Sequence, residues 1–265
     1  MEVMAKISKG TLMDQIYIPK NRTGMETGSY VIIKPIAEKE KKEIKENLLF
    51  YNVHNIEPIK IEIVEKIMKI MDERVEYDNI IIFGSFLKEG FEFKDIDVLI
   101  LTEKEVNSKS IEKRIKKKIG LLAHLLSTTN TELRIGLETD PFYQMIISKC
   151  ISKKRLIYNT KNKPNYKILD LHLLKSKVLI DSFEMLTGKE KYLLTRNMVA
   201  IKIYLANKKI SPEILDKEII FDFKLDSVNE IKDNMLKIRD FRDIYKSIYH
   251  KLFEKIMEGI KHESK

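Results

Sequence analysis

Two short, almost uninterrupted apolar runs constrain the fold of this chain most. Ile80-Ile81-Ile82-Phe83 is wholly apolar, and residues 96–101 contain a single polar residue, Asp97. Runs of this length and composition are typical of β-strands that are buried on both faces, and such strands need a helical layer on each side. Apolar residues at helical spacing predict these helices at residues 63–75 and 108–126. Residues 133–137 and 155–158 are candidates for further strands.

These patterns predict an α+β protein whose mixed sheet has helices on its faces. We divide the chain into three parts. Residues 1–36 form a small β module, residues 37–160 form the sheet domain with a linker helix at 37–50, and residues 165–265 form an all-helical domain. In the last part, helices are predicted at 167–186, 189–207 and 226–259, with Gly188 and Pro212 as breaks.

Composition excludes several classes of protein. The chain is 43% hydrophobic and 34% charged, which is too apolar for a disordered protein. Cys150 is the only cysteine, so intrachain disulfides and cysteine-cluster zinc sites are excluded. No apolar run has the roughly 18 residues of a membrane span, and the first ten residues lack a signal peptide's apolar stretch. We therefore expect a cytoplasmic protein without a membrane partner.

The positive charge is concentrated in the helical part. Residues 1–150 contain 24 basic and 24 acidic residues, whereas residues 151–265 contain 25 basic and 16 acidic ones, which accounts for the whole net charge of +9. An excess of this kind favours an anionic partner such as RNA, because binding phosphates releases their counterions. The alternative is a lysine-rich helical surface that faces only water.

The motif with the clearest chemistry follows the first apolar run. Gly84-Ser85 is separated by nine residues from Asp95-Ile96-Asp97-Val98. Glycine lets the backbone approach a phosphate closely, and Ser85 adds a small hydroxyl donor. On a strand, Asp95 and Asp97 point to the same face with Cα atoms about 6.6 Å apart. Carboxylates so close repel each other unless a cation lies between them, and oxygen ligands of this type favour Mg²⁺.

This spacing resembles the signature of the nucleotidyltransferase superfamily related to DNA polymerase β, including its minimal and aminoglycoside-type members. The resemblance implies transfer of a nucleoside monophosphate from ATP or another nucleoside triphosphate to a hydroxyl group, with two metal ions and three carboxylates. It implies that Gly84 and Ser85 hold the triphosphate and that Asp95 and Asp97 bind the metals. The motif covers about 16 residues.

The third carboxylate of that family lies on a later strand, which we place at residues 131–138. Glu132 and Glu138 share one face of this predicted strand, and the family position falls near Gly136. We choose Glu132 as the third catalytic and metal-binding residue, with Glu138 as the alternative. His124, placed among leucines of the predicted helix 108–126, is interpreted as a packed core histidine.

The N-terminal stretch has a second, shorter resemblance. An Ile18-Pro19 step, Arg22, Gly28 and the β-forming run 30–33 resemble the AbrB-like swapped-hairpin fold. That likeness implies a module that pairs with a second copy, as in a homodimer, and touches nucleic acid. The alternative is a β-hairpin that covers the next domain.

Together, these features predict an Mg²⁺-dependent nucleotidyltransferase whose helical domain supplies the acceptor site. The charge favours RNA, including tRNA, as the acceptor, with a protein hydroxyl as the other choice. The alternative from another class is a nucleic-acid-binding or regulatory protein that keeps the scaffold without the chemistry.

Overall fold

The computed structural model describes residues 7–11, 13–16, 30–31, 48–158 and 161–263, and it divides into two compact units, Met1–Lys45 and Glu46–Lys265. In the first unit, β1 (Ile7–Ser8) pairs with β2 (Gln15–Ile16) in antiparallel fashion. Residues 1–6, 12, 17–29 and 32–36 of the predicted β module lie outside the described residues, as do residues 37–47 of the predicted linker helix. The AbrB-like resemblance therefore stays a prediction.

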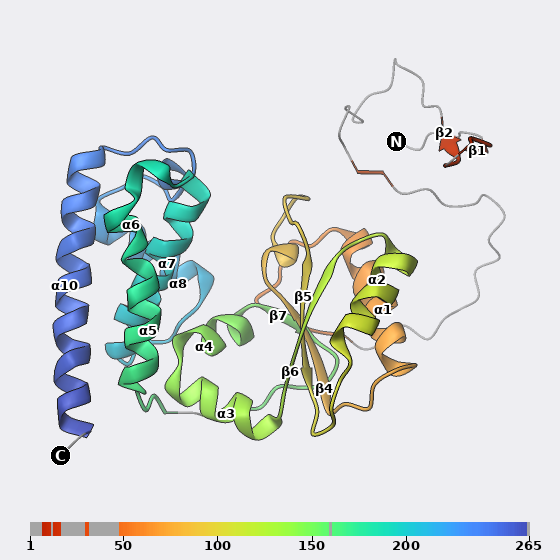
Figure 1. The fold of residues 1–265 in the computed structure, drawn as a ribbon, viewed down its shortest axis with the longest axis horizontal. Helices are drawn as coiled ribbons and strands as arrows, with labels where there is room; N and C mark the ends of the chain where they lie inside the picture. Colours follow the sequence, from red (N-terminus) through yellow and green to blue (C-terminus); the bar gives the residue numbers. More distant parts are fainter. Residues whose placement is uncertain (1–6, 12, 17–29, 32–47, 159–160, 264–265) are drawn as a thin grey trace. The chain divides into compact units, whose positions relative to one another are not determined.

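A five-stranded mixed sheet is the centre of the second unit (Figure 1). In spatial order, its strands are β3 (Leu49–Tyr51), β7 (Cys150–Ser152), β4 (Asn79–Phe83), β5 (Ile96–Leu101) and β6 (Ala123–Thr128). Only β5 and β6 run parallel among these neighbours. The α+β class and both central strands are confirmed. The predicted linker helix 37–50 is wrong at residues 49–50, which belong to β3.

Two helices, α1 (Pro58–Asp72) and α2 (Ser108–Ile119), cover one face of the sheet. Their buried residues Ile67 and Ile115 pack with Ile82 and Val98 of the central strands. The prediction of one helix over 108–126 is wrong beyond Ile119. The backbone turns left-handed at Gly120 (φ 83°) and then continues as the edge strand β6. Glycine is favoured at such a helix end because it has no Cβ.

The opposite face is covered by α3 (Asn130–Thr139) and α4 (Pro141–Ser148). The predicted strand at 131–138 is therefore wrong. Thr129 and Glu132 form a reciprocal capping box at the start of α3, and Leu133 and Leu137, four residues apart, are both buried. The predicted strand at 155–158 is also wrong, because the strand in this part of the chain is β7, which ends at Ser152 and lies between β3 and β4.

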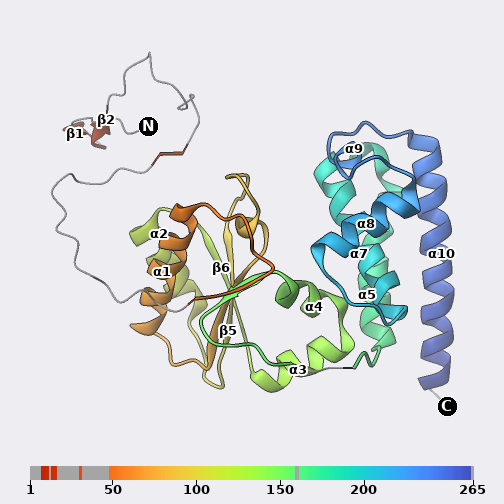
Figure 2. The same cartoon turned by 180° about the vertical axis from the view of Figure 1, so that it is seen from behind.

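The helical part of the chain follows residue 165. Its helices are α5 (Tyr166–Ser176), α6 (Val178–Asp181), α7 (Gly188–Leu205), α8 (Pro212–Phe223), α9 (Asn229–Lys232) and α10 (Ile238–Glu263), with a 3₁₀ turn at Phe183–Met185. They share one apolar core, and Figure 2 shows α8 beside the long α10. The structure splits the predicted helix 167–186, adds α8, and starts the last long helix at Ile238 instead of residue 226.

Direct contacts join the helical part to α3 and to the start of α4, which cover the sheet. The Nε2 atom of His172 on α5 lies 3.0 Å from Oδ2 of Asp140, which also caps α4. The Tyr204 hydroxyl of α7 donates a hydrogen bond to the carbonyl of Glu138. Within the residues that the structure describes, no helix combines the length and apolar character needed to cross a membrane.

Candidate active site

The turn after β4 brings the backbone directly against a carboxylate. Gly84 has φ 86° and ψ −158°, and Ser85 begins the 3₁₀ turn Ser85–Leu87. A Cβ atom added at Gly84 would lie only 2.1 Å from Oδ2 of Asp97. Glycine is therefore required twice, for the positive φ and for the close approach of Asp97.

Asp97 faces this turn from the neighbouring strand. It pairs in register with Phe83, and its side chain is 24% exposed. Burial raises the pKa of the Asp97 carboxyl, and the nearby Asp95 charge raises it further, while His124 partly offsets both effects. Asp95 is half-buried and directly precedes β5. The two acids thus share one electrostatic environment at the end of the sheet where Gly84 lies.

His124 is the site residue that the sequence analysis missed. It lies on β6 directly opposite Asp97 in the parallel register, with 3.6 Å between its Nδ1 atom and Oδ1 of Asp97. Its side chain is 57% exposed, so the interpretation as a packed core histidine is wrong. Gly120 is the signal that could have found it, because a glycine after a lysine-rich helical turn predicts a helix end.

The structure does not bring Glu132 to the two aspartates. Glu132 follows Thr128, which pairs with Leu101 at the far end of β5, whereas Asp97 pairs with His124 near its start. The four rises between His124 and Thr128 span about 13 Å of strand. The Glu132 carboxylate accepts hydrogen bonds from the Thr129 nitrogen (2.9 Å) and the Thr128 hydroxyl (3.0 Å), which hold its pKa below the usual value.

The alternative, Glu138, lies later on the same helix. Its carboxylate pairs with Lys163 at 3.1 Å, and its carbonyl accepts the hydrogen bond from Tyr204. Both glutamates are therefore occupied in capping or joining elements of the fold.

Basic side chains from the helical part face the loop between Ser85 and Asp95. Lys189 of α7 pairs with Glu92 of this loop at 2.9 Å. Lys232 lies over the Tyr192 ring, 4.6 Å from its centroid. Desolvation lowers the pKa of Lys88, and the positive charges of Arg196 and Lys232 lower it further. Clustered cations of this type favour an anionic ligand at this end of the sheet.

The donor set fits one magnesium ion that arrives with a nucleotide. Within the described residues, no group of three or more His, Cys, Asp or Glu side chains could hold a metal ion. Asp95 and Asp97 supply two carboxylates, and Mg²⁺ is commonly held by one or two carboxylates together with substrate phosphates and water. These two residues are the ones that would hold it.

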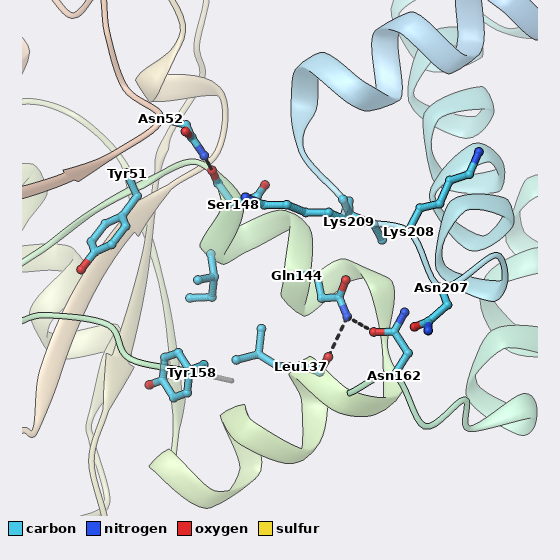
Figure 3. Close-up of a pocket in the computed structure, with 12 residues that line it drawn as sticks. Tyr51, Asn52, Leu137, Gln144, Ser148, Tyr158, Asn162, Asn207, Lys208 and Lys209 are labelled. Atoms are coloured by element: carbon cyan, nitrogen blue, oxygen red, sulfur yellow. Dashed lines mark hydrogen bonds between the residues drawn. The ribbon is translucent and has the colours of Figure 1, made fainter. Parts of the chain in front are cut away.

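A separate pocket of about 500 Å³ lies between α4 and the loop after α7 (Figure 3). Its amide side chains mostly bind the protein itself. Gln144 donates to the Leu137 carbonyl and to Asn162, both at 2.8 Å, and Asn52 donates to the Ser148 carbonyl. Neither Asp95 nor Asp97 lines this pocket. Its hydrogen bonds connect α4 to neighbouring segments of the protein, so we assign the pocket a structural role.

The comparison with known families agrees with this geometry. Residues 64–157 match the nucleotidyltransferase domain family. The match begins in α1, ends after β7 and contains Gly84, Ser85, Asp95, Asp97 and His124. The match supports nucleotidyl transfer in general as the chemistry of residues 64–157. No match was found among curated proteins or among solved structures.

Proposed function

We propose that this protein transfers a nucleoside monophosphate from ATP or another nucleoside triphosphate to a hydroxyl acceptor, and releases pyrophosphate. The observation that carries the proposal is the approach of Asp97 to the Gly84 turn, with Asp95 beside it. We assign triphosphate binding to Gly84 and Ser85, and metal binding to Asp95 and Asp97. Magnesium held there would neutralise the triphosphate and activate the attacking hydroxyl group.

The helical part, residues 165–265, is proposed to receive the acceptor. Arg196 of α7 is half-buried and, among the residues that the structure describes, forms no salt bridge. In contrast, the half-buried Lys202 on the same helix pairs with both Glu218 (2.8 Å) and Asp222 (2.6 Å). The unpaired charge of Arg196 supports an anionic substrate at the loop, and we propose RNA as the acceptor.

One experiment tests the transfer reaction. Purified protein is incubated with Mg²⁺, labelled ATP or CTP, and total RNA. We expect label in the RNA, and we expect Asp95→Ala to reduce the labelling at least a hundredfold, because it removes one of two metal-binding carboxylates. Absence of label in RNA, protein and small molecules with every nucleotide would refute the proposed activity.

A non-catalytic binding protein is the second candidate, and one observation favours it. His124, not a third carboxylate, faces Asp97 on the neighbouring strand. A scaffold that has lost its chemistry would bind RNA with the same affinity and salt dependence in the wild type and in Asp95→Ala, without labelling it.

The variant His124→Asp tests whether a third carboxylate opposite Asp97 strengthens metal binding. This change places a third carboxylate opposite Asp97, and oxygen ligands hold divalent ions such as Mn²⁺ better as their charge increases. We expect Mn²⁺ to bind at least tenfold more tightly, measured by titration with electron paramagnetic resonance. His124→Asn, which adds no charge, is the control and should stay within threefold of the wild type. Equal Mn²⁺ affinity in His124→Asp and His124→Asn would contradict the assignment of metal binding to Asp95 and Asp97.

A further inference from the structure

A lysine lies completely buried beneath the loop that joins Ser85 to Asp95. Lys60 is in the first turn of α1, directly after Pro58 and Ile59, and its side chain is 0% exposed. Burying an ammonium group is unfavourable unless it is paired and hydrogen-bonded. The surroundings of Lys60 must therefore compensate for the loss of water.

The partners of Lys60 come almost entirely from this loop. Its Nζ atom donates to the carbonyls of Lys88 and Gly90, both at 2.5 Å, and lies 2.8 Å from Oε2 of Glu57. The rings of three phenylalanines lie around the ammonium group, with centroids 5.7, 5.3 and 5.6 Å away, namely Phe86, Phe91 and Phe93.

Glu57 completes this arrangement from the residue before α1. Its Oε1 atom accepts a hydrogen bond from the Gly90 nitrogen at 2.5 Å. Burial opposes ionisation of Glu57, but the hydrogen bonds from Lys60 and from the backbone more than offset this effect and lower its pKa. Gly90 is consequently held by both its nitrogen and its carbonyl.

This arrangement fixes the direction of the loop's backbone dipoles. Carbonyl oxygens repel phosphate, so a loop that accompanies a triphosphate must turn them away from it. Lys60 draws the carbonyls of Lys88 and Gly90 toward the interior. The loop begins at the Gly84-Ser85 turn and ends at Asp95, so its conformation affects both halves of the candidate active site.

We propose that Lys60 is a positioning residue for nucleotidyl transfer, which sets the nucleotide-binding loop without touching the substrate. This inference rests on the proposed function. It predicts that the buried charge of Lys60 matters for nucleotide binding beyond its contribution to stability.

The test compares two buried lysines. Lys191 is also buried, donates to Asn234 at 2.9 Å and lies 4.1 Å from the Phe183 ring centroid, in the helical core instead of the loop. We expect the KM for the nucleoside triphosphate to be at least tenfold higher in Lys60→Met than in Lys191→Met. The kcat of both variants should stay within threefold of the wild-type value. We expect Lys60→Arg, which keeps the charge and the donors, to restore most of this loss.

Amide hydrogen exchange over residues 86–94, measured without nucleotide, provides a second readout. We expect exchange at least tenfold faster in Lys60→Met and unchanged in Lys191→Met. If Lys60→Met does not fold, Glu57→Gln tests the same bonds at constant volume, with an expected increase of at least threefold in exchange. Unchanged exchange or an unchanged KM in Lys60→Met would overturn the role of Lys60, and so would unchanged exchange in Glu57→Gln. A wild-type protein that transfers no nucleotide would overturn the proposed function alone.

Discussion

Gly84→Ala is expected to reduce nucleotidyl transfer at least a thousandfold. The new methyl group would meet Oδ2 of Asp97 at 2.1 Å, so the carboxylate or the turn must move. The positive φ of 86° adds backbone strain of about 1–3 kcal/mol for a residue with a Cβ. Because reactive geometry tolerates displacements of less than about 1 Å, movement of Asp97 should cost much more activity than the strain costs stability.

Gly120→Ala separates these two effects. Gly120 has a similar φ of 83° at the end of α2, but a Cβ atom there would meet no described atom within 4 Å apart from its chain neighbours and the backbone of its own helix. This variant should therefore lose comparable stability, by about 1 kcal/mol, and keep transfer activity within threefold of the wild type. Steady-state transfer rates and thermal unfolding of both variants provide the measurement. Equal loss of activity in the two variants would show that backbone strain, and not contact with Asp97, explains the role of Gly84.

The local part of this site could be predicted from sequence because its geometry depends on neighbours in the chain. An apolar run ending at Gly84 predicts a strand followed by a turn, and alternation places Asp95 and Asp97 on one face. These inferences need no knowledge of which strands are neighbours. The two central strands are confirmed for the same reason.

The partners across the site could not be predicted in this way. His124 meets Asp97 only because β6 pairs in parallel with β5, which is a long-range contact. Apolar residues continue at helical spacing from Ile111 to Leu126 and so obscure the helix end at Gly120. The pattern at Thr129 and Glu132 is a readable capping box, but the alternation around Arg134 favoured a strand. Lys60 has no sequence signal, since one lysine in a helical turn is usually solvated.

Asp97→Asn is expected to abolish transfer and at the same time to stabilise the protein without its ligands. The loss of a carboxylate that we propose to bind metal should reduce activity at least a thousandfold, equivalent to about 4 kcal/mol of transition-state stabilisation. The gain in stability follows from the raised pKa of Asp97, which is caused by burial and by Asp95. A carboxyl with a raised pKa in the folded state binds its proton more tightly there than in the unfolded chain. The folded protein therefore loses relative stability as the pH rises from the ordinary Asp value through the raised one.

The pH decides whether Asp97→Asn is more stable than the wild type or equally stable. Asp97→Asn removes both the burial of the carboxylate charge and its repulsion by Asp95, so this variant should unfold at a higher temperature than the wild type at pH 7, by about 2–4 °C for a gain of about 1 kcal/mol. Below the ordinary Asp value the wild-type side chain is protonated as well, and the difference should disappear. Asp222→Asn is the matched control, because Asp222 is also partly buried but is paired with Lys202 at 2.6 Å, and its loss should destabilise the protein. Thermal unfolding in EDTA at pH 7 and pH 3.5 distinguishes these outcomes. A melting temperature of Asp97→Asn below that of the wild type at pH 7 would mean that Asp97 stabilises the fold, and would contradict its assignment as a carboxylate held ready for a cation.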